Sequence, residues 1–337
     1  MSTAIKLNMY IGLTKKRLNL IWQTKQGEQT DFEFEYVTQV LFKDIETNYH
    51  FDEGAYSMIL DNSVIIYSND SKKAPPELIY YLNKFRRKKF RFYLLHFSNE
   101  GLNHDYWYYS KANYVFRNYF DPQIKAPNVL FIPLGFKSGN LNKDSTLNNC
   151  GEKMIDVSFV GQPKSDRFEM INVMGKMQSH YVHKTTSWNC PTALSQEECI
   201  DIYKKTKYAP CPMGNVHPDS FRICEALEWG SIPVVRTVNG TDYFTNVFGN
   251  HPLKVVNNWA ELPEVINGNN YCAERKHVHT WYQNFKAELQ TKIKDIIESG
   301  GIDQGHQSFI LKDVSSGSHR LYNTGRNALK KMYRRFK

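Results

Sequence analysis

The sequence has 337 residues, of which 41% are hydrophobic and 23% are charged, and its formal net charge is +9. This length suits about two domains, and the hydrophobic share can fill packed cores, which excludes a globally disordered chain. Neither a heptad nor a Gly-X-Y repeat is present, which excludes coiled-coil and collagen-like rods. The basic balance leaves three classes of partner open: nucleic acid, an anionic membrane surface and a phosphate-bearing small molecule.

The compartment is predicted from targeting signals and from the cysteine pattern. No run approaches the about 18 consecutive apolar residues of a membrane-spanning helix, and residues 1–18 contain no apolar segment of signal-peptide length. The six cysteines include no C-x-x-C pair, so the sequence signals neither a zinc site nor a redox motif. We therefore expect free thiols in a soluble cytoplasmic protein, with one or two disulfides as the alternative.

The first half of the chain alternates between short apolar runs and amphipathic stretches. Runs rich in Val, Ile, Phe and Tyr predict strands at residues 6–11, 63–67, 90–96, 114–117 and 129–133. Residues 75–89 predict a helix, because a Pro pair stands at the start and basic residues stand at the end. The polar stretch 137–153 contains clustered Gly, Asn, Ser and Asp, and it predicts a linker.

The same alternation resumes after this linker. Strands are predicted at residues 155–160, 208–212, 232–236 and 252–256, and helices at 166–178, 195–205, 221–229, 259–267, 273–299 and 318–336. Alternating elements of these lengths predict parallel sheets with crossover helices. The expected organisation is a Rossmann-like α/β domain over residues 1–140, a linker over 141–153, a second α/β domain over 154–317 and a basic C-terminal helix over 318–337.

Polar residues at the ends of the predicted strands are the first candidates for a site, because open α/β sheets bind ligands beyond the carboxyl ends of their strands. In the first half these candidates are Asp70, His96, Glu100, Arg117 and Asn118. In the second half they are Gly161, Gly214, Asn215, Asp242 and Tyr243. Position alone assigns no chemistry to them.

The densest of these segments runs from residue 208 to residue 235 and contains a strand, a glycine-bearing loop and a helix. Ser220 stands where an N-cap is expected, and Arg222 falls in the first helical turn. A helix N-terminus with an Arg is suited to phosphate. Glu225 lies three residues later on the same face, where its carboxylate can accept hydrogen bonds from two ribose hydroxyls. The alternative is an ordinary helix start with Arg222 and Glu225 as a surface pair.

The order of residues in this segment resembles a family signature. The string Ser220-x-Arg222-x-x-Glu225-Ala226-Leu227-x-x-Gly230-x-Ile232-Pro233-Val234, after Pro212-x-Gly214, is similar to the S-x-R-x-x-E-A-L-x-x-G-C-I-P-V donor-site signature of exostosin-type glycosyltransferases. Ser231 and Cys224 depart from that signature. Residues 116–120, 131–136 and 156–161 with Arg167 resemble further motifs, and together they resemble the ribitol xylosyltransferase-like branch of the family.

The resemblance implies a GT-B architecture, in which two Rossmann-like domains face each other across a cleft, and we expect the C-terminal helix to pack back on the first domain. It also implies an inverting glycosyltransferase that moves a sugar from a nucleotide sugar, usually a UDP-sugar, to a hydroxyl of a glycan or other acceptor. Neither a cofactor nor a metal ion is implied. The implied donor-binding residues are Gly161, Arg167, Gly214, Asn215, Ser220, Arg222 and Glu225. Asp242 and Tyr243 are added to this set only because they follow the predicted strand 232–236.

Within this set the resemblance suggests separate roles. Arg222 and the backbone near Ser220 would hold the diphosphate with help from Arg167, and Glu225 would hold the ribose. Gly161 would permit close approach of the backbone at the cleft.

The catalytic base and the acceptor side are expected in the first domain. Glu100 is the first choice as base, with His96 and Asp70 as alternatives, because each follows or ends a predicted strand. Glu100 can equally be a solvated loop carboxylate, and His96 can be a strand-end histidine with a satisfied hydrogen bond. Arg117 and Asn118 are expected on the acceptor side, although Arg117 can instead pair structurally with a carboxylate.

Other classes of function fit parts of the sequence. A GT-B scaffold that binds glycans without catalysis would share these elements, although the intact Arg222 and Glu225 favour an enzyme. A nucleic-acid-binding protein would explain the charge, but the basic residues are scattered and no recognised binding motif appears. An NAD-linked dehydrogenase lacks its G-x-G-x-x-G loop. A contact between the basic C-terminal residues and an anionic surface is also compatible with the sequence.

Overall fold

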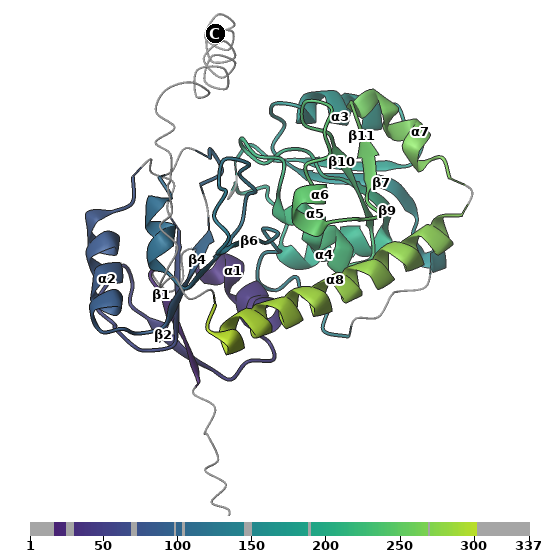
Figure 1. Ribbon diagram of the computed structural model, residues 1–337. Helices are drawn as coiled ribbons and strands as arrows, with labels where there is room; N and C mark the ends of the chain where they lie inside the picture. Colours follow the sequence, from purple (N-terminus) through teal and green to yellow (C-terminus); the bar gives the residue numbers. More distant parts are fainter. Residues whose placement is uncertain are drawn as a thin grey trace, which may run out of the picture. The chain divides into compact units, whose positions relative to one another are not determined.

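The computed structural model describes residues 17–24, 30–68, 73–97, 99–102, 105–144, 150–187, 190–268 and 270–301 (Figure 1). One compact unit extends to Ile302, and a second unit comprises Asp303–Lys337. The second unit lies outside the described residues, as do the predicted strand 6–11, the candidate base Asp70 and the predicted basic helix 318–336.

The first half of the chain forms a six-stranded parallel sheet in the order β2-β1-β3-β4-β5-β6. Its strands are β1 (Leu18–Trp22), β2 (Thr47–Phe51), β3 (Ser63–Ser68), β4 (Phe92–Phe97), β5 (Tyr114–Arg117) and β6 (Val129–Phe131). The helices are α1 (Thr30–Tyr36), its π-helical continuation η1 (Val37–Leu41), α2 (Pro76–Arg87) and the 3-10 helix η2 (Trp107–Lys111). Ile66 pairs with Leu95 and Leu95 with Phe116, so the carboxyl ends of β3, β4 and β5 meet at one edge.

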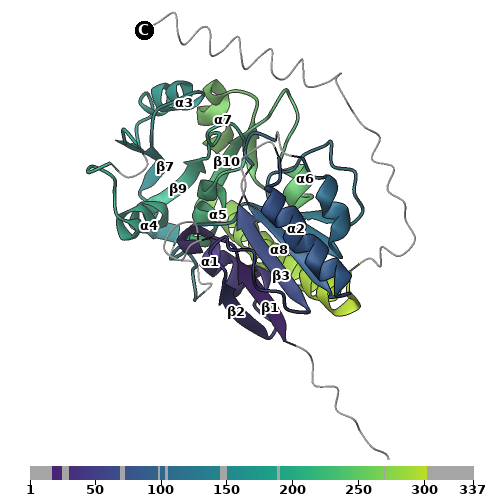
Figure 2. The ribbon, with the colours of Figure 1, turned by 90° about the vertical axis from the view of Figure 1, so that its left-hand side faces the viewer.

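Alternate residues of these strands pack against two different layers. Ile65 and Leu94 join the cluster that contains Tyr81 of α2, and Figure 2 shows α2 lying over one face of the sheet. Ile66 and Leu95 belong to the cluster on the opposite face. This alternation follows from the two-residue period of a strand. Because both faces are covered, β3 and β4 are nearly continuous apolar runs, which made them predictable.

The second half forms a five-stranded parallel sheet in the order β11-β10-β9-β7-β8. Its strands are β7 (Ile155–Gly161), β8 (His180–Lys184), β9 (Thr206–Pro210), β10 (Ile232–Arg236) and β11 (Lys254–Val256). Its helices are α3 (Arg167–Met174), α4 (Gln196–Lys205), α5 (Phe221–Glu228), α6 (Thr245–Phe248), α7 (Leu262–Ile266) and α8 (Tyr271–Ser299), with short 3-10 turns η3 (Cys150–Glu152) and η4 (Trp259–Glu261). The prediction of two Rossmann-like parallel sheets is confirmed.

Helix α8 belongs to both halves of the chain, as Figure 1 shows. Its buried residues recur every three or four positions, which gives one continuous packing stripe: Arg275, Val278, Tyr282, Lys286, Leu289, Ile293 and Ile297. Near its start, Arg275 Nε donates to the Gly230 carbonyl beside the second sheet at 2.9 Å. Near its end, the Ile297 carbonyl accepts from Tyr93 Oη of β4 at 3.1 Å. Within the described ranges, neither α8 nor any other helix has the length and apolar character needed to cross a bilayer.

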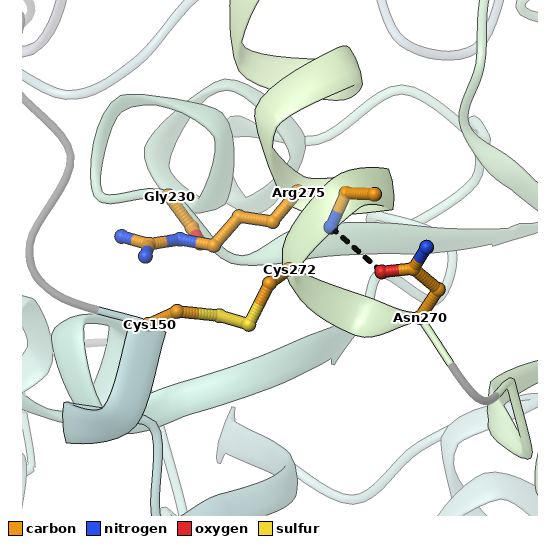
Figure 3. Close-up of a disulfide and its surroundings, with 6 residues drawn as sticks. Cys150, Gly230, Asn270, Cys272 and Arg275 are labelled. Atoms are coloured by element: carbon orange, nitrogen blue, oxygen red, sulfur yellow. Dashed lines mark hydrogen bonds between the residues drawn. A yellow bond between two sulfur atoms is a disulfide. The ribbon is translucent and has the colours of Figure 1, made fainter.

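A disulfide joins Cys150 to Cys272, which corrects the expectation that all six cysteines are free thiols. Cys150 lies just before β7 and Cys272 lies in the first turn of α8, so the bond ties the two ends of the second α/β half together (Figure 3). Asn270 caps the same helix by accepting from the Ala273 amide at 3.4 Å. Stable disulfides are typical of oxidising compartments, so this bond removes the cysteine-based support for a cytoplasmic location.

Candidate functional site

A cavity of about 610 Å³ opens at the carboxyl ends of β7 and β9, within the size range of small-molecule sites. In the order β8-β7-β9-β10-β11 the chain reverses direction between β7 and β9, and this topological switch point is where doubly wound sheets bind ligands. The first half of the chain contributes Glu100, Tyr119, Leu134 and Lys137 to the lining. The second half contributes all seven motif-based donor residues: Gly161, Arg167, Gly214, Asn215, Ser220, Arg222 and Glu225.

Arg222 stands in the first turn of α5 and reaches back to the end of β7. Its Nη2 and Nε lie 3.3 and 3.4 Å from the Val160 carbonyl oxygen, and its guanidinium stacks 5.2 Å from the Phe159 ring centre. No carboxylate of the described residues forms an ion pair with it. Its charge therefore faces the cavity without a direct ion pair to a described residue, and Glu225 is a carboxyl group near enough to interact with it.

Three further cations, Lys137, Lys164 and Arg167, line the same cavity. Burial, together with the nearby charge of Arg222, lowers the pKa of Arg167 to about 10. Burial and the charges of Arg167 and Arg222 also lower the pKa of Lys164. Like charges held together in this way favour a bound anion. Lys164 was not predicted as a site residue.

Arg167 differs from Arg222 in what its guanidinium contacts. It donates to the Met213 carbonyl at 2.6 and 3.1 Å, to the Gly214 carbonyl at 2.9 Å and to the Gln162 carbonyl at 3.1 Å. These bonds hold the loop after β9 against the end of β7. The arrangement indicates a residue that shapes the loop and adds positive charge, rather than one with free donors for a ligand.

The Ser220 side chain is buried and polar but has no hydrogen-bond partner in the described part of the chain. Ser220 occupies the predicted N-cap position of α5, with extended backbone, but its side chain does not cap the helix. The residue is 6% exposed and lines the cavity, and its Oγ is unpaired. An unpaired buried hydroxyl costs about 1–3 kcal/mol, which a ligand acceptor would offset.

Carboxyl groups lie on either side of Ser220. Burial raises the pKa of Glu225, while Arg222 and Lys137 oppose this rise. Burial also raises the pKa of Asp219 to about 7, although its Oδ2 accepts from the Leu134 amide at 3.0 Å. Lys137 and Asp219 line the cavity but were not predicted as site residues.

Glu100 reaches the cavity from the loop after β4, as expected, but one oxygen of its carboxylate already accepts hydrogen bonds from the protein. Its Oε1 accepts from three successive amides of the opposite half: those of Asn215, Val216 at 2.9 Å and His217 at 3.3 Å. That oxygen can accept a hydroxyl proton only after these bonds are given up. The geometry therefore places Glu100 at the cavity with Oε1 occupied, which leaves only Oε2 to act as a base in this state.

The other described candidates from the first half, His96, Arg117 and Asn118, do not line the cavity. His96 is completely buried and stacks on Tyr67 with ring centres 4.5 Å apart. Arg117 is 1% exposed and donates to His96 Nδ1 at 2.9 Å and to the Tyr109 hydroxyl at 2.7 Å. Asn118 is also completely buried. His96 and Arg117 form a buried hydrogen-bond network with Tyr109 of η2, and they offer no open acceptor surface.

Asp242 and Tyr243 also lie away from the cavity, contrary to their expected position at the donor sugar. Asp242 pairs with the buried His251 at 3.1 Å. Tyr243 is 8% exposed, and its hydroxyl accepts from the Phe120 amide of the first half at 2.8 Å. Both residues lie between β10 and α6. Asp242 holds His251, and Tyr243 joins this segment to the first half of the chain.

Comparisons with known proteins agree with part of the sequence resemblance. Residues 142–300 match the family model described as RXYLT1 C-terminal domain. The chain is 26% identical over 284 residues to mouse ribitol-5-phosphate xylosyltransferase 1, covering 73% of this chain and 64% of the relative. It is 28% identical over 212 residues to the human protein of the same name, covering 55% of this chain and 48% of the relative.

The chain thus spans less than two thirds of the length of either relative. A solved N-terminal domain of Candida albicans trehalose-6-phosphate phosphatase superposes with a TM-score of 0.52 at 9% identity, over 85% of this chain and 97% of that domain. At that identity the likeness concerns the fold alone. The findings support similarity to xylosyltransferases, as the narrower resemblance predicted, whereas membership of the exostosin family stays a prediction.

Proposed function

We propose that this protein is a glycosyltransferase that moves a sugar from a nucleotide sugar, with UDP as the nucleotide, to a hydroxyl group of a glycan acceptor. The observation that carries the proposal is the meeting of Ser220, Arg222 and Glu225 at one switch-point cavity, where Arg222 forms no ion pair with a described residue. A nucleoside diphosphate offers what this site lacks, because its phosphates are anionic and its ribose hydroxyls are donors.

In the proposed reaction the acceptor oxygen forms a bond to the anomeric carbon while the bond from that carbon to the diphosphate oxygen breaks. The acceptor proton passes to a base, and the leaving diphosphate takes the bonding electrons. Arg222 and Lys164 would stabilise the charge that develops on the diphosphate, and Glu225 would orient the ribose. The relatives are named as xylosyltransferases, which makes a pentose our choice of sugar. The inverting and metal-independent course rests on the sequence resemblance.

Donor binding is the first test of this proposal. UDP-xylose, other UDP-sugars and GDP-sugars would be compared by thermal shift, since a ligand at 100 times its Kd stabilises a protein by about 2.7 kcal/mol. We expect a UDP-sugar to raise the Tm of the wild-type chain, and Arg222→Ala and Glu225→Ala to abolish that rise. Arg236→Ala is the matched control, because Arg236 lies 3.9 Å from Glu169 and outside the cavity. If no nucleotide stabilises the protein, or if both site variants respond like wild type, the assignment is wrong.

A further inference from the structure

The loop after β9 presents a concave row of backbone donors that a protein carboxylate already fills. We propose that the amides of Asn215, Val216 and His217 form a phosphate-binding subsite, and that the Glu100 carboxylate occupies this subsite as an internal competitor when no donor is bound. The inference rests on the proposed function only for the identity of the molecule that carries the phosphate.

The shape of the loop supports an anion site. Three successive N–H groups point at the same Glu100 oxygen, and such convergence is typical of backbone nests that hold phosphate. Gly214 precedes these amides, and a Cβ at that position would collide with Glu100 Oε1 and lie 3.3 Å from the His217 carbonyl oxygen. The loop therefore needs glycine there to bring an anion close to the backbone. Carboxylate and phosphate oxygens are both strong acceptors, so either can fill the row.

The surroundings of the subsite favour a more highly charged anion than one carboxylate. Lys164 Nζ donates to the Asn215 side-chain oxygen, and Arg167 donates to the Gly214 carbonyl. Arg222 lines the same cavity and lowers the pKa values of both other cations. The cavity lining holds four cations against the carboxyl groups of Glu100, Asp219 and Glu225, and burial raises the pKa of the last two, which favours their neutral forms. A diphosphate would add negative charge beside these cations.

Ser220 gives an independent indication that a ligand is missing from this place. The residue is only 6% exposed, and its Oγ has no hydrogen-bond partner among the described residues. Ser220 lines the same cavity as the row of amides. Neither Glu100 nor any other described group satisfies it. A ligand larger than the carboxylate could contact both the amide row and this hydroxyl.

Glu100 would then reduce the apparent affinity for phosphate ligands in the free protein. The apparent Kd rises in inverse proportion to the fraction of molecules whose subsite is open. If Glu100 fills the nest in about nine molecules out of ten, its removal should tighten binding about tenfold. A general base in the same position would behave differently, since its loss would lower turnover by about 10²–10⁴-fold and leave phosphate affinity unchanged.

The test is calorimetric titration of the full chain with inorganic pyrophosphate, UDP and uridine. The variants are Glu100→Ala, Glu100→Gln, which keeps the shape but not the charge, and Asp105→Ala, which removes an exposed charge from the same loop region. We expect pyrophosphate and UDP to bind about tenfold more tightly to Glu100→Ala and by an intermediate factor to Glu100→Gln. Uridine affinity should not change, and Asp105→Ala should match wild type with every ligand.

The outcomes separate this inference from the proposed function. Unchanged or weaker binding of pyrophosphate by Glu100→Ala, or no binding of pyrophosphate to any form, would overturn the inference. Lost turnover with unchanged pyrophosphate affinity would overturn it in favour of a catalytic base. Tighter pyrophosphate binding by Glu100→Ala, with no binding of UDP or uridine to any form, would support the subsite and reject the nucleotide assignment.

Discussion

Gly161 and Arg222 lie so close that a Cβ on the glycine would stand 2.6 Å from Arg222 Nη2. Gly161 ends β7 with φ +151°, a conformation that side chains rarely adopt. The guanidinium therefore occupies the space that any other residue at position 161 would need. The last residue of β7 and the arginine in the first turn of α5 depend on each other, although 61 positions separate them.

We expect Gly161→Ala to weaken UDP binding by at least about tenfold, because the added methyl group displaces Arg222 from the cavity. Titration calorimetry with UDP measures the effect. Gly240→Ala is the matched control, because Gly240 also has positive φ, at +74°, but nothing lies within 4 Å of its Cβ position. That control should cost about 1 kcal/mol of folding stability and leave UDP affinity intact. Equal UDP affinities for the two variants would contradict the role given to Arg222.

Ser220→Ala should affect the folding stability and the UDP affinity of the protein in different ways. Removing an unpaired buried hydroxyl should leave the free energy of unfolding unchanged or raise it by about 1 kcal/mol, while UDP affinity falls. Urea unfolding and UDP titration measure the two effects. In contrast, Ser231 Oγ donates to the Tyr203 and Thr206 carbonyls at 2.7 and 2.9 Å. Ser231→Ala should therefore destabilise the protein by about 1–2 kcal/mol, and a similar loss in Ser220→Ala would show that its hydroxyl is satisfied.

The buried Asp219 should make stability fall as the pH rises. Its carboxyl has a pKa of about 7 in the folded protein against 3.8 ordinarily, so between these values the folded state binds the extra proton. The stabilisation is complete below about pH 4 and is lost by about pH 7, with an upper size of about 4 kcal/mol.

Asp219→Asn isolates this contribution, since Asn can still accept from the Leu134 amide. Its free energy of unfolding should exceed that of wild type at pH 8 but not at pH 4, as measured by urea unfolding at both values. His217, whose pKa burial lowers to about 3, acts in the opposite sense and is present in both proteins. A constant difference between the two proteins across this range would refute the buried, protonated carboxyl.

The disulfide between Cys150 and Cys272 should stabilise the second half of the chain. It closes a loop with a sequence separation of 122, and cross-links of this span contribute about 2–5 kcal/mol. We expect the double variant Cys150→Ala, Cys272→Ala to unfold at lower urea concentration than oxidised wild type. Dithiothreitol should lower the stability of wild type by a similar amount and leave the double variant unchanged. A response of the double variant to the reductant would point to the remaining cysteines.

The spacing of residues within short segments was sufficient to predict the part of the candidate site that the second half of the chain forms. Ser220, Arg222 and Glu225 share one strand–loop–helix segment, and Gly161 and Gly214 end or follow predicted strands, so their meeting at a switch point follows from topology. Lys164 lies three residues beyond the end of β7 and could have been found by the same rule. Asp219 was hidden beside Ser220, because sequence alone does not show that a carboxyl is buried.

Contacts between distant segments could not be predicted from spacing. The row of amides around Glu100 joins residues more than 110 positions apart, and amide donors carry no side-chain signal. The strands β1, β2 and β8 were missed. Strands β2 and β8 lie at sheet edges and carry polar residues such as His50 and His183, whereas β1 is a buried inner strand. Asp242, Tyr243, Arg117 and Asn118 do follow strands or end them, yet tertiary packing buried the last three and paired Asp242 with His251.

The path of α8 has a mechanical consequence for the cavity. The chain crosses from the first sheet to the second before β7, and α8 crosses back, tied at Arg275 on one side and at Ile297 on the other. Two domains joined by a single chain crossing can rotate relative to each other about any axis. Two separate crossings restrict the relative movement mainly to rotation about the line that connects the crossings. We therefore expect relative movement of the two halves to be mainly a rotation about this line, which would change the distance between Glu100 and the loop after β9 at the cavity.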